Sequence, residues 1–457
     1  MLIEPGRRVH FVGVGGAGMS AIAKVLLEMG AVISGSDLKR SRAATMLEAM
    51  GVNLHVGHDA RLVENAEAVV VSSAIPDTNP EIRRAGELGI EVWSRGRALA
   101  EILSASRSVV IAGTHGKTTT TSMAVSIFRT AGLDPTYLVG GGLNDVGTNA
   151  RFGRGAFAIA ESDESDGSFL LLRPEIAVIT NLEIDHVDYW DSIDALRAAF
   201  TEFTGRVPDG GAIVVPHDNA ELVAMAAAAE REVVTFGTGG NVDARDIAFE
   251  AGGVRFTLCV FGDLAPVELR APGMHNVLNA LAAAAAAHRA GIGAAAIAEG
   301  LAAFRGVERR FEVRGSAGEV TVIDDYAHHP TEVRATLTAA QPGPWRRVVA
   351  VFQPHRYSRT AAFASAFGDA FGVADQVVIT DVYGAGETPV PGVSGKLVAD
   401  AVCHRWPGRS VAYLPRRAEL VEYLARIARP GDAVVTLGAG DVGAVGDELL
   451  VRLRTRS

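Results

Sequence analysis

Residues 108–118 read Ser-Val-Val-Ile-Ala-Gly-Thr-His-Gly-Lys-Thr, a short apolar run followed by a glycine-rich turn and a Gly-Lys-Thr triplet. The apolar run predicts a buried strand, and the residues from Lys117 onward predict a helix. Glycines between a strand and a helix let backbone N–H groups approach an anion, which the N-terminus of the helix also attracts. Lys117 can neutralise phosphate charge, and the Thr118 hydroxyl can bind Mg²⁺. The stretch therefore predicts an ATP-binding loop in an α/β fold.

This loop is shorter than the common phosphate-binding pattern, which places a glycine five residues before the Gly-Lys pair. Ile111 occupies that position here. The competing interpretation is a glycine turn with a surface lysine. Because strand, loop, Lys-Thr and helix follow one another in the required order, we favour the phosphate-binding interpretation.

Strands alternate with helices in three successive segments, a pattern that predicts parallel sheets. Apolar strands open the segments near residues 9–13, 108–112 and 319–323. We place the boundaries near residues 104 and 306, which gives domains at 1–104, 105–306 and 307–457. The predicted architecture is a Rossmann-like N-terminal domain, a central P-loop ATPase-like domain with a mostly parallel sheet, and a Rossmann-like C-terminal domain.

Composition excludes several classes of protein. The 457 residues carry a net charge of -10, which argues against a general nucleic-acid or membrane-surface binder. The two cysteines, Cys259 and Cys403, cannot form a disulfide framework or a zinc site. The longest apolar tract, 277–287, is too short to span a bilayer, and the N-terminus lacks a signal-peptide layout. We therefore expect a cytoplasmic protein that binds neither nucleic acid nor membranes.

Acidic residues follow two of the predicted central strands. Residues 161–166 read Glu-Ser-Asp-Glu-Ser-Asp, and residues 181–186 read Asn-Leu-Glu-Ile-Asp-His. Since the carboxyl ends of parallel strands meet at one edge of a sheet, we expect these groups to face Lys117. Hard Mg²⁺ prefers such oxygen ligands. Each stretch taken alone is more typical of a solvated turn.

Two glycine fingerprints lie near the ends of the chain. Gly13-x-Gly15-x-x-Gly18 follows a strand, opens a helix and precedes Asp37, as in dinucleotide-binding sites. It fits NAD or FAD, or the diphosphate of a UDP group. A second spacing, Gly438-x-Gly440-x-x-Gly443, leaves room for only a short helix. It fits equally a ligand-lining loop and a structural turn.

Polar residues also follow two C-terminal strands. Residues 324–330 read Asp-Asp-Tyr-Ala-His-His-Pro, and residues 352–360 read Phe-Gln-Pro-His-Arg-Tyr-Ser-Arg-Thr. Arg356 and Arg359 are three residues apart, so they can share one helix face. Paired guanidinium groups suit a carboxylate, although a charged sheet rim is the alternative.

Together these motifs resemble those of the Mur ligases, which build the peptide stem of bacterial peptidoglycan. They occur in the family's order along nearly the whole chain, and the shortened phosphate loop is a family trait. The residues that carry the resemblance are 13–20, 112–120, 161–166, 181–186, 272–276 with Asn279, 309–311, 324–330 and 352–360.

The resemblance implies three binding surfaces and a catalytic set. The UDP part of UDP-N-acetylmuramate would contact Gly15, Gly16, Gly18, Met19, Ser20, Asp37, Ser72 and Ser73. ATP would contact Gly113, Thr114, His115, Gly116, Lys117, Thr118, Thr119, His275, Asn276 and Asn279, with Arg309 or Arg310 and Asp324 by its phosphates and ribose. Mg²⁺ would bind Thr118, Glu161 and His186, and an amino acid would contact Tyr326, His328, Arg356 and Arg359. The catalytic residues would be Lys117, His186, His328, Arg356 and Arg359.

The implied reaction joins L-alanine to the lactyl carboxylate of UDP-N-acetylmuramate through an acyl phosphate, with ATP and Mg²⁺ as cofactors, in peptidoglycan precursor synthesis. Later ligases of the pathway carry a carbamoylated lysine, whereas no lysine lies between Lys117 and Lys396 here. The peptide-recycling relative usually reads Asp-Glu-Tyr-Asp where residues 163–166 read Asp-Glu-Ser-Asp. Both details favour the enzyme that adds the first amino acid.

Several alternatives stay open at the level of the sequence. The first glycine fingerprint also fits a nucleotide-dependent oxidoreductase, and the phosphate loop also fits an ATP-driven switch protein. The sequence does not exclude glycine or serine as the acceptor in place of L-alanine, and the base that deprotonates the amine is unassigned. We expect a monomer or a homodimer whose domains close on the ligands.

Overall fold

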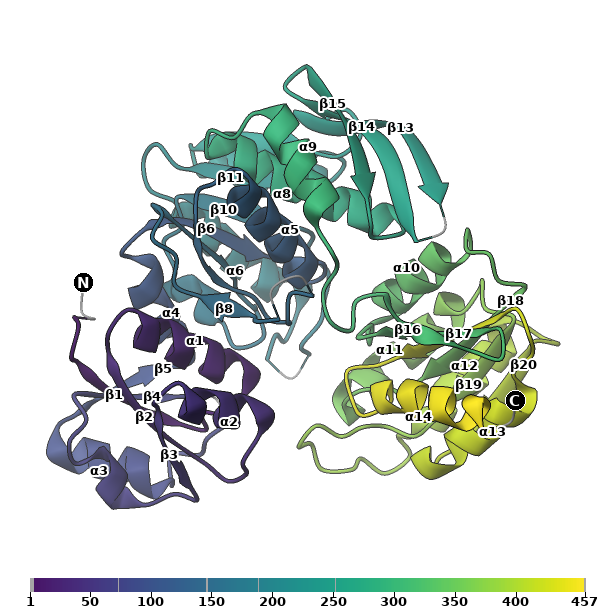
Figure 1. Ribbon diagram of the computed structural model, residues 1–457, viewed down its shortest axis with the longest axis horizontal. Coiled ribbons are helices and arrows are strands. Elements are labelled where there is room, and N and C mark those ends of the chain that lie inside the picture. The colour runs from purple at the N-terminus through teal and green to yellow at the C-terminus, as the bar shows by residue number, and fades with distance from the viewer. Residues whose placement is uncertain (1–3, 73, 145–146, 188, 251, 456–457) are drawn as a thin grey trace.

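The computed structural model describes residues 4–72, 74–144, 147–187, 189–250 and 252–455. Three sheets, each with its own helices, form three lobes along the chain, coloured from purple to yellow in Figure 1. This arrangement confirms the predicted three-domain α/β architecture. Within the described ranges, no helix combines the length and apolar character that crossing a membrane requires.

The first sheet is fully parallel with strand order β3-β2-β1-β4-β5. Gly13, with φ of 79°, turns the chain from β1 into α1, in line with the predicted fingerprint. The strands are β1 (Arg8–Val12), β2 (Val32–Asp37), β3 (Asn53–Val56), β4 (Ala68–Val71) and β5 (Glu91–Ser94), and the helices are α1 (Ala17–Glu28), α2 (Arg42–Ala49), η1 (Ala60–Val63), α3 (Pro80–Leu88) and α4 (Arg95–Leu103).

The central sheet has strand order β15-β14-β13-β12-β11-β10-β6-β9-β7-β8. Neighbouring strands from β13 to β7 in this order pair in parallel, whereas the pairs β7–β8, β13–β14 and β14–β15 are antiparallel. The strands are β6 (Arg107–Ala112), β7 (Thr136–Leu138), β8 (Ala150–Arg151), β9 (Phe157–Glu161), β10 (Ile176–Ile179), β11 (Ala212–Pro216), β12 (Glu232–Phe236), β13 (Val242–Glu250), β14 (Gly253–Val260) and β15 (Asp263–Leu269). The helices are α5 (Lys117–Thr130), η2 (Ser168–Leu171), α6 (Ile193–Gly205), α7 (Ala220–Ala228), α8 (Met274–Arg289) and α9 (Ala294–Ala303).

The third sheet has strand order β16-β17-β21-β18-β19-β20. The pair β16–β17 is antiparallel, and the other neighbouring strands pair in parallel. The strands are β16 (Glu312–Ala317), β17 (Val320–Asp325), β18 (Arg347–Phe352), β19 (Gln376–Ile379), β20 (Ser410–Tyr413) and β21 (Asp432–Leu437). The helices are α10 (Pro330–Ala340), α11 (Tyr357–Ala370), α12 (Gly395–Arg405), η3 (Arg417–Glu419), α13 (Leu420–Ile427) and α14 (Gly443–Arg454). Helix α14 has 12 residues, so the expectation of only a short helix after the last fingerprint is wrong.

The boundaries predicted near residues 104 and 306 fall between α4 and β6 and between α9 and β16. We therefore retain 1–104, 105–306 and 307–457 as proposed domains. The hydrophobic cores of the three lobes differ in how far they are separated from one another. One contiguous cluster of buried apolar side chains includes Phe11 and Leu26 of the first lobe and Phe200 of the central lobe, whereas the third lobe has clusters of its own. The first two lobes thus share a hydrophobic core.

Candidate active site

The phosphate loop lies between β6 and α5, as predicted. Gly113 has φ of 119°, and a Cβ there would lie 2.3 Å from the Thr180 hydroxyl. Gly116, the N-cap of α5, has φ of 79°, and a Cβ there would lie 2.4 Å from the Asn279 side chain. Both positions require glycine because of backbone conformation and space. The loop is therefore packed closely against β10 and α8.

Lys117 is held inside the loop by carboxylates from the next strand end. Its ammonium donates to the Gly113 carbonyl at 2.6 Å and to Glu164 at 2.8 Å. Burial alone would lower the pKa of Lys117, but Glu164 and Asp163 outweigh it and hold that pKa above its usual value. Burial raises the pKa of Glu164 to about 7. The lysine is a permanent cation that phosphate oxygens can reach.

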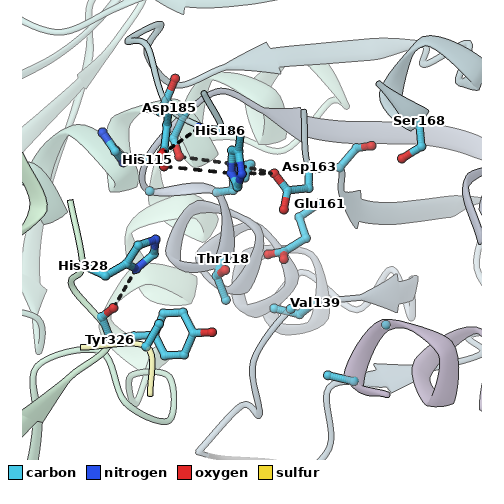
Figure 2. A pocket seen from close by; sticks show the side chains of 18 of the residues that line it. His115, Thr118, Val139, Glu161, Asp163, Ser168, Asp185, His186, Tyr326 and His328 are labelled. Atoms are coloured by element: carbon cyan, nitrogen blue, oxygen red, sulfur yellow. Dashed lines mark hydrogen bonds and ion pairs between the residues drawn. The ribbon is translucent and has the colours of Figure 1, made fainter. Parts of the chain in front are cut away.

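The predicted metal ligands gather beside this lysine. Figure 2 shows Glu161 and Asp163 with His186 on one side of the cavity, close to Thr118. Burial raises the pKa of Glu161, while the neighbouring Gly140 N–H and Thr118 hydroxyl oppose that rise. Burial lowers the pKa of His186, so its ring is neutral and able to bind a metal.

One oxygen of Glu161 points to a further ligand. Its Oε2 is buried and has no hydrogen-bond partner among the described residues. A Cβ on Gly140 would lie 1.9 Å from the other carboxyl oxygen, so only glycine permits this approach. A buried, unpaired carboxylate oxygen beside a threonine hydroxyl fits a hard divalent cation such as Mg²⁺.

A cavity of about 300 Å³ lies on the other side of the phosphate loop. It is lined by His115, Gly116, Thr119, His275, Asn276, Asn279 and Arg310, all predicted to contact ATP. Asp324 is not among its lining residues, whereas Asp325 is. Successive strand residues point to opposite faces, and the Asp324 carboxylate instead accepts from Arg309 Nε at 2.8 Å and from the Thr436 hydroxyl at 2.7 Å.

The predicted amino-acid residues line the main cavity, which has a volume of about 430 Å³ and also contains the phosphate loop. Tyr326 and His328 lie opposite the metal-ligand group in Figure 2. Nδ1 of His328 donates to the Tyr326 carbonyl at 2.9 Å, which leaves Nε2 as the accepting nitrogen. Burial lowers the pKa of His328 to about 4, so the ring is neutral at pH 7.

Arg359 reaches this cavity but is already paired. Its guanidinium donates to both oxygens of Asp185, at 2.9 and 3.0 Å, and both side chains are 5% exposed. Burial alone would raise the pKa of Asp185, but Arg359 and His186 lower it to about 2. Arg356, the N-cap of α11, has φ of 67° and lines the same cavity, with Glu387 at 3.9 Å. Asp185 lies in the polar stretch 181–186, but its pairing with Arg359 was not predicted from the sequence.

The predicted UDP-binding residues are spread over the first lobe. Gly16 is the N-cap of α1, Met19 is in the core, Ser72 is partly exposed, and Ser73 lies outside the described residues. The N–H of Gly15 donates to Asp37 at 2.9 Å. Gly18 lines the main cavity, whereas Ser20 lines a third cavity of about 460 Å³ between the lobes.

Two arginines, Arg95 and Arg310, line cavities that the sequence did not predict for them. Arg95, at the start of α4, lines the main cavity and donates to Asp166 at 3.3 Å, so it brings a cation from the first lobe to the central one. Its position directly after β5 is the signal that was available, because parallel strands present ligand groups at their carboxyl ends. Arg310 lines all three cavities and is therefore their common wall.

The last glycine fingerprint also takes part in the site. Ala439 lines the main cavity, and the Gly438 carbonyl accepts from Arg309 at 2.7 Å. A Cβ on Gly440 would lie 2.3 Å from the Gln353 side chain. The loop is thus both a packed turn and part of the cavity wall, which reconciles the two interpretations of its sequence.

Comparisons with known proteins show similarity along nearly the whole chain. Models of the Mur ligase family catalytic domain, the Mur ligase middle domain and the Mur ligase glutamate ligase domain match residues 8–107, 111–287 and 309–440. A UDP-N-acetylmuramate–L-alanine ligase of Rubrobacter xylanophilus is 48% identical over 98% of this chain and all of that protein. One from Anaeromyxobacter dehalogenans is 46% identical over 98% of each chain.

Solved structures show the same fold. The UDP-N-acetylmuramate–alanine ligase of Thermotoga maritima superposes with a TM-score of 0.80 at 28% identity, covering 98% of this chain and all of that one. A murein peptide ligase of Psychrobacter arcticus gives 0.72 at 25% identity, covering 98% and 99%. The chain therefore belongs to the Mur ligase family and is an ATP-dependent ligase.

Proposed function

We propose that this protein joins L-alanine to the lactyl carboxylate of UDP-N-acetylmuramate, at the cost of ATP, during synthesis of peptidoglycan precursors. The observation that carries the proposal is the main cavity, which collects groups from all three lobes. Gly18 and Arg95 come from the first lobe, Lys117 from the central lobe, and His328 and Arg356 from the third. The names of the relatives supply the identity of the substrates.

The proposed reaction has two steps. A lactyl carboxylate oxygen attacks the γ-phosphorus of ATP, the bond to the β–γ bridging oxygen breaks, and ADP leaves. The amine of L-alanine then attacks the acyl carbon, and the bond from that carbon to the phosphate oxygen breaks. Inorganic phosphate leaves, and the amine proton is lost. No protein nucleophile is needed, so the protein acts by positioning the reactants and neutralising charge.

Within this scheme the cavity residues have distinct tasks. The Lys117 ammonium, which donates to the Glu164 carboxylate, would shift to the phosphates. Its flexible side chain allows the ammonium to contact either anion. Arg356 and Arg359 would attract the carboxylate of L-alanine. Asp185, already paired with Arg359, would attract the ammonium, so the cavity offers both charges that a zwitterion requires.

The metal would lie by the carboxylate with the unpaired oxygen. Thr118, Glu161 and His186 would hold Mg²⁺, and the buried Oε2 of Glu161 supports this assignment. Bound there, Mg²⁺ supplies positive charge that neutralises the phosphates. Asp163, Glu164 and His186 form a second compact group of possible ligands next to it.

The test measures phosphate release from ATP and Mg²⁺ with UDP-N-acetylmuramate present, while the amino acid is varied. We expect release to require both UDP-N-acetylmuramate and L-alanine, with glycine and L-serine as weaker acceptors. Release that is independent of both substrates would contradict the ligase proposal and favour an ATP-driven switch.

A further inference from the structure

The main cavity and the nucleotide cavity share a wall built around one histidine of the phosphate loop. His115, Gly116, Arg310 and Glu332 line both cavities. The backbone of His115 is fixed to the central sheet, because its N–H donates to Asn181 at 2.8 Å and its carbonyl accepts from Thr180 at 2.6 Å. The ring therefore projects from a rigid base.

That ring lies between two carboxylates from different lobes. Its Nε2 is 3.4 Å from Glu183 of the central lobe, and its Nδ1 is 3.5 Å from Glu332 of α10 in the third lobe. The ring also packs on His329, with centroids 4.7 Å apart. Burial alone would lower the pKa of His115, but Glu183 and Glu332 outweigh it and raise that pKa to about 9. A charged imidazolium thus joins the two lobes at neutral pH.

Glu332 holds the predicted amino-acid site as well. Its Oε2 accepts from the backbone N–H groups of His328 and His329, at 3.0 and 3.2 Å, as the third residue of a capping box on α10. The same oxygen is 3.4 Å from Nδ1 of the His328 ring. One carboxylate therefore contacts both the phosphate loop and the histidine that faces the amino acid.

A second contact between the lobes fixes the geometry. The Thr331 hydroxyl donates to Glu183 at 2.8 Å, one residue before Glu332. Glu183 and Glu332 thus flank the His115 ring, and the Thr331 hydroxyl bonds α10 to the central lobe. Among the described residues, the buried apolar clusters of the third lobe include no residue of the central lobe. These polar contacts determine where α10 lies.

We propose that His115 and Glu332 are positioning residues that couple nucleotide binding at the phosphate loop to the placement of residues 326–334, and so to capture of the amino acid. Bound nucleotide phosphates act on the His115 ring from the phosphate loop, the ring positions Glu332, and Glu332 orients His328. The identity of the amino acid rests on the proposed function, but the coupling between the two cavities does not.

The first test follows amide hydrogen exchange of residues 326–334 in the full-length protein, with and without a non-hydrolysable ATP analogue and Mg²⁺. In the natural protein we expect the analogue to slow exchange about fivefold or more. His115→Asn and Glu332→Gln should abolish most of this slowing. The Gln amide oxygen can still accept from the backbone N–H groups, so helix α10 is retained. His404→Asn, at an exposed position of α12, is the control and should behave like the natural protein.

The second test is a double-mutant cycle on turnover. Each single variant should raise KM for L-alanine about tenfold. The double variant should have the same KM as either single variant, because each substitution removes the same His115–Glu332 contact. Thermal unfolding of every variant checks that it is folded. Equal slowing of exchange in His115→Asn and the natural protein, or no slowing in either, would overturn the inference. Absence of product with L-alanine from the natural protein instead overturns the proposed function, while the exchange result still decides the coupling.

Discussion

At the level of single residues, Lys117 is the side chain on which turnover should depend most. Its ammonium already lies in the loop, 2.8 Å from Glu164. We expect Lys117→Ala to lower kcat by at least about a thousandfold, since the charge that stabilises the transferring phosphoryl group is lost. Phosphate release measures this effect. Lys396→Ala, which removes an exposed lysine paired with Asp400, is the matched control and should retain full activity.

Glu161 should determine how strongly the metal binds. We expect Glu161→Gln to raise the Mg²⁺ concentration needed for half-maximal activity about tenfold to a hundredfold, because a neutral amide is a poorer ligand for a hard cation. A Mg²⁺ titration of turnover at fixed ATP measures the shift. Glu202→Gln, at an exposed position of helix α6, should leave the titration unchanged. An unchanged Mg²⁺ requirement in Glu161→Gln would remove Glu161 from the metal site.

His115 should make the stability of the protein depend on pH. Its pKa rises from the usual value near 6.5 to about 9 in the folded state, so the folded state binds the proton more tightly. The resulting stabilisation is fully present below pH 6.5 and is lost as the pH rises through 9. We therefore expect the difference in Tm between the natural protein and His115→Asn to shrink from pH 6.5 to pH 9.5. A constant difference over that range would show that the ring is neutral.

Several of these side chains could be found in the sequence, but their contacts could not. The acidic stretch at 161–166 and the polar stretch at 324–330 reach the cavities because parallel strands end at one edge of a sheet. Which of two adjacent aspartates lines the 300 Å³ cavity depends on the orientation of β17, and Asp325 does so rather than Asp324. The role of Glu332 in a capping box was not predicted, because the N-cap of α10 is a histidine and not the usual serine or threonine.

At the level of secondary structure elements, helix α3 of the first lobe depends on one buried carboxylate. Glu81 is 0% exposed and accepts from His10, Ser36, His58 and the Asp59 N–H, at 2.7 to 3.1 Å. Burial alone would raise the pKa of Glu81, but His10 and Ser36 outweigh it and lower that pKa. This stabilisation is present above the unfolded pKa and is lost as the pH falls through the lower folded value.

We expect Glu81→Gln to reduce the free energy of unfolding by about 1–3 kcal/mol, because an amide cannot accept all four hydrogen bonds. Urea unfolding at pH 7 measures the change. Glu87→Gln in the same helix removes only an exposed pair with Arg84, so its effect should be close to zero. Equal effects of the two substitutions would show that the buried network contributes nothing.

Elements with continuous apolar runs were the predictable ones. The strand predicted at 108–112 lies within β6, and the strand predicted near 319–323 corresponds to β17. The hairpin strands β13 to β15 were not predicted. Only alternate residues of β15 are buried, so these strands lack the continuous apolar run that marks a strand covered on both faces.

At the level of the whole molecule, the lobes are joined unequally. The first and central lobes share a core, and the Lys24 ammonium of α1 donates to Thr148 and the Ala150 carbonyl, each at 2.7 Å. The third lobe meets them through polar contacts around His115 and Asp185. We therefore expect the third lobe to move as a unit when ligands bind, while the other two stay together.

Small-angle scattering measures this motion. We expect the radius of gyration to decrease when an ATP analogue, Mg²⁺ and UDP-N-acetylmuramate are added together, because the cavity groups lie on separate lobes. Either ligand alone should give a smaller decrease. An identical scattering curve in all four conditions would show that the lobes are already in their final arrangement.

The position of Arg310 bears on how this protein could be inhibited. Its guanidinium borders all three cavities, lies over the Tyr326 ring at 5.3 Å and is 3.8 Å from Glu332. A compound anchored by an anion on Arg310 could extend into any of the cavities from the same starting point. A substitution that abolished this anchor would alter the walls of these three cavities at once, so escape from such a compound at this residue would also disturb the protein's own proposed binding surfaces.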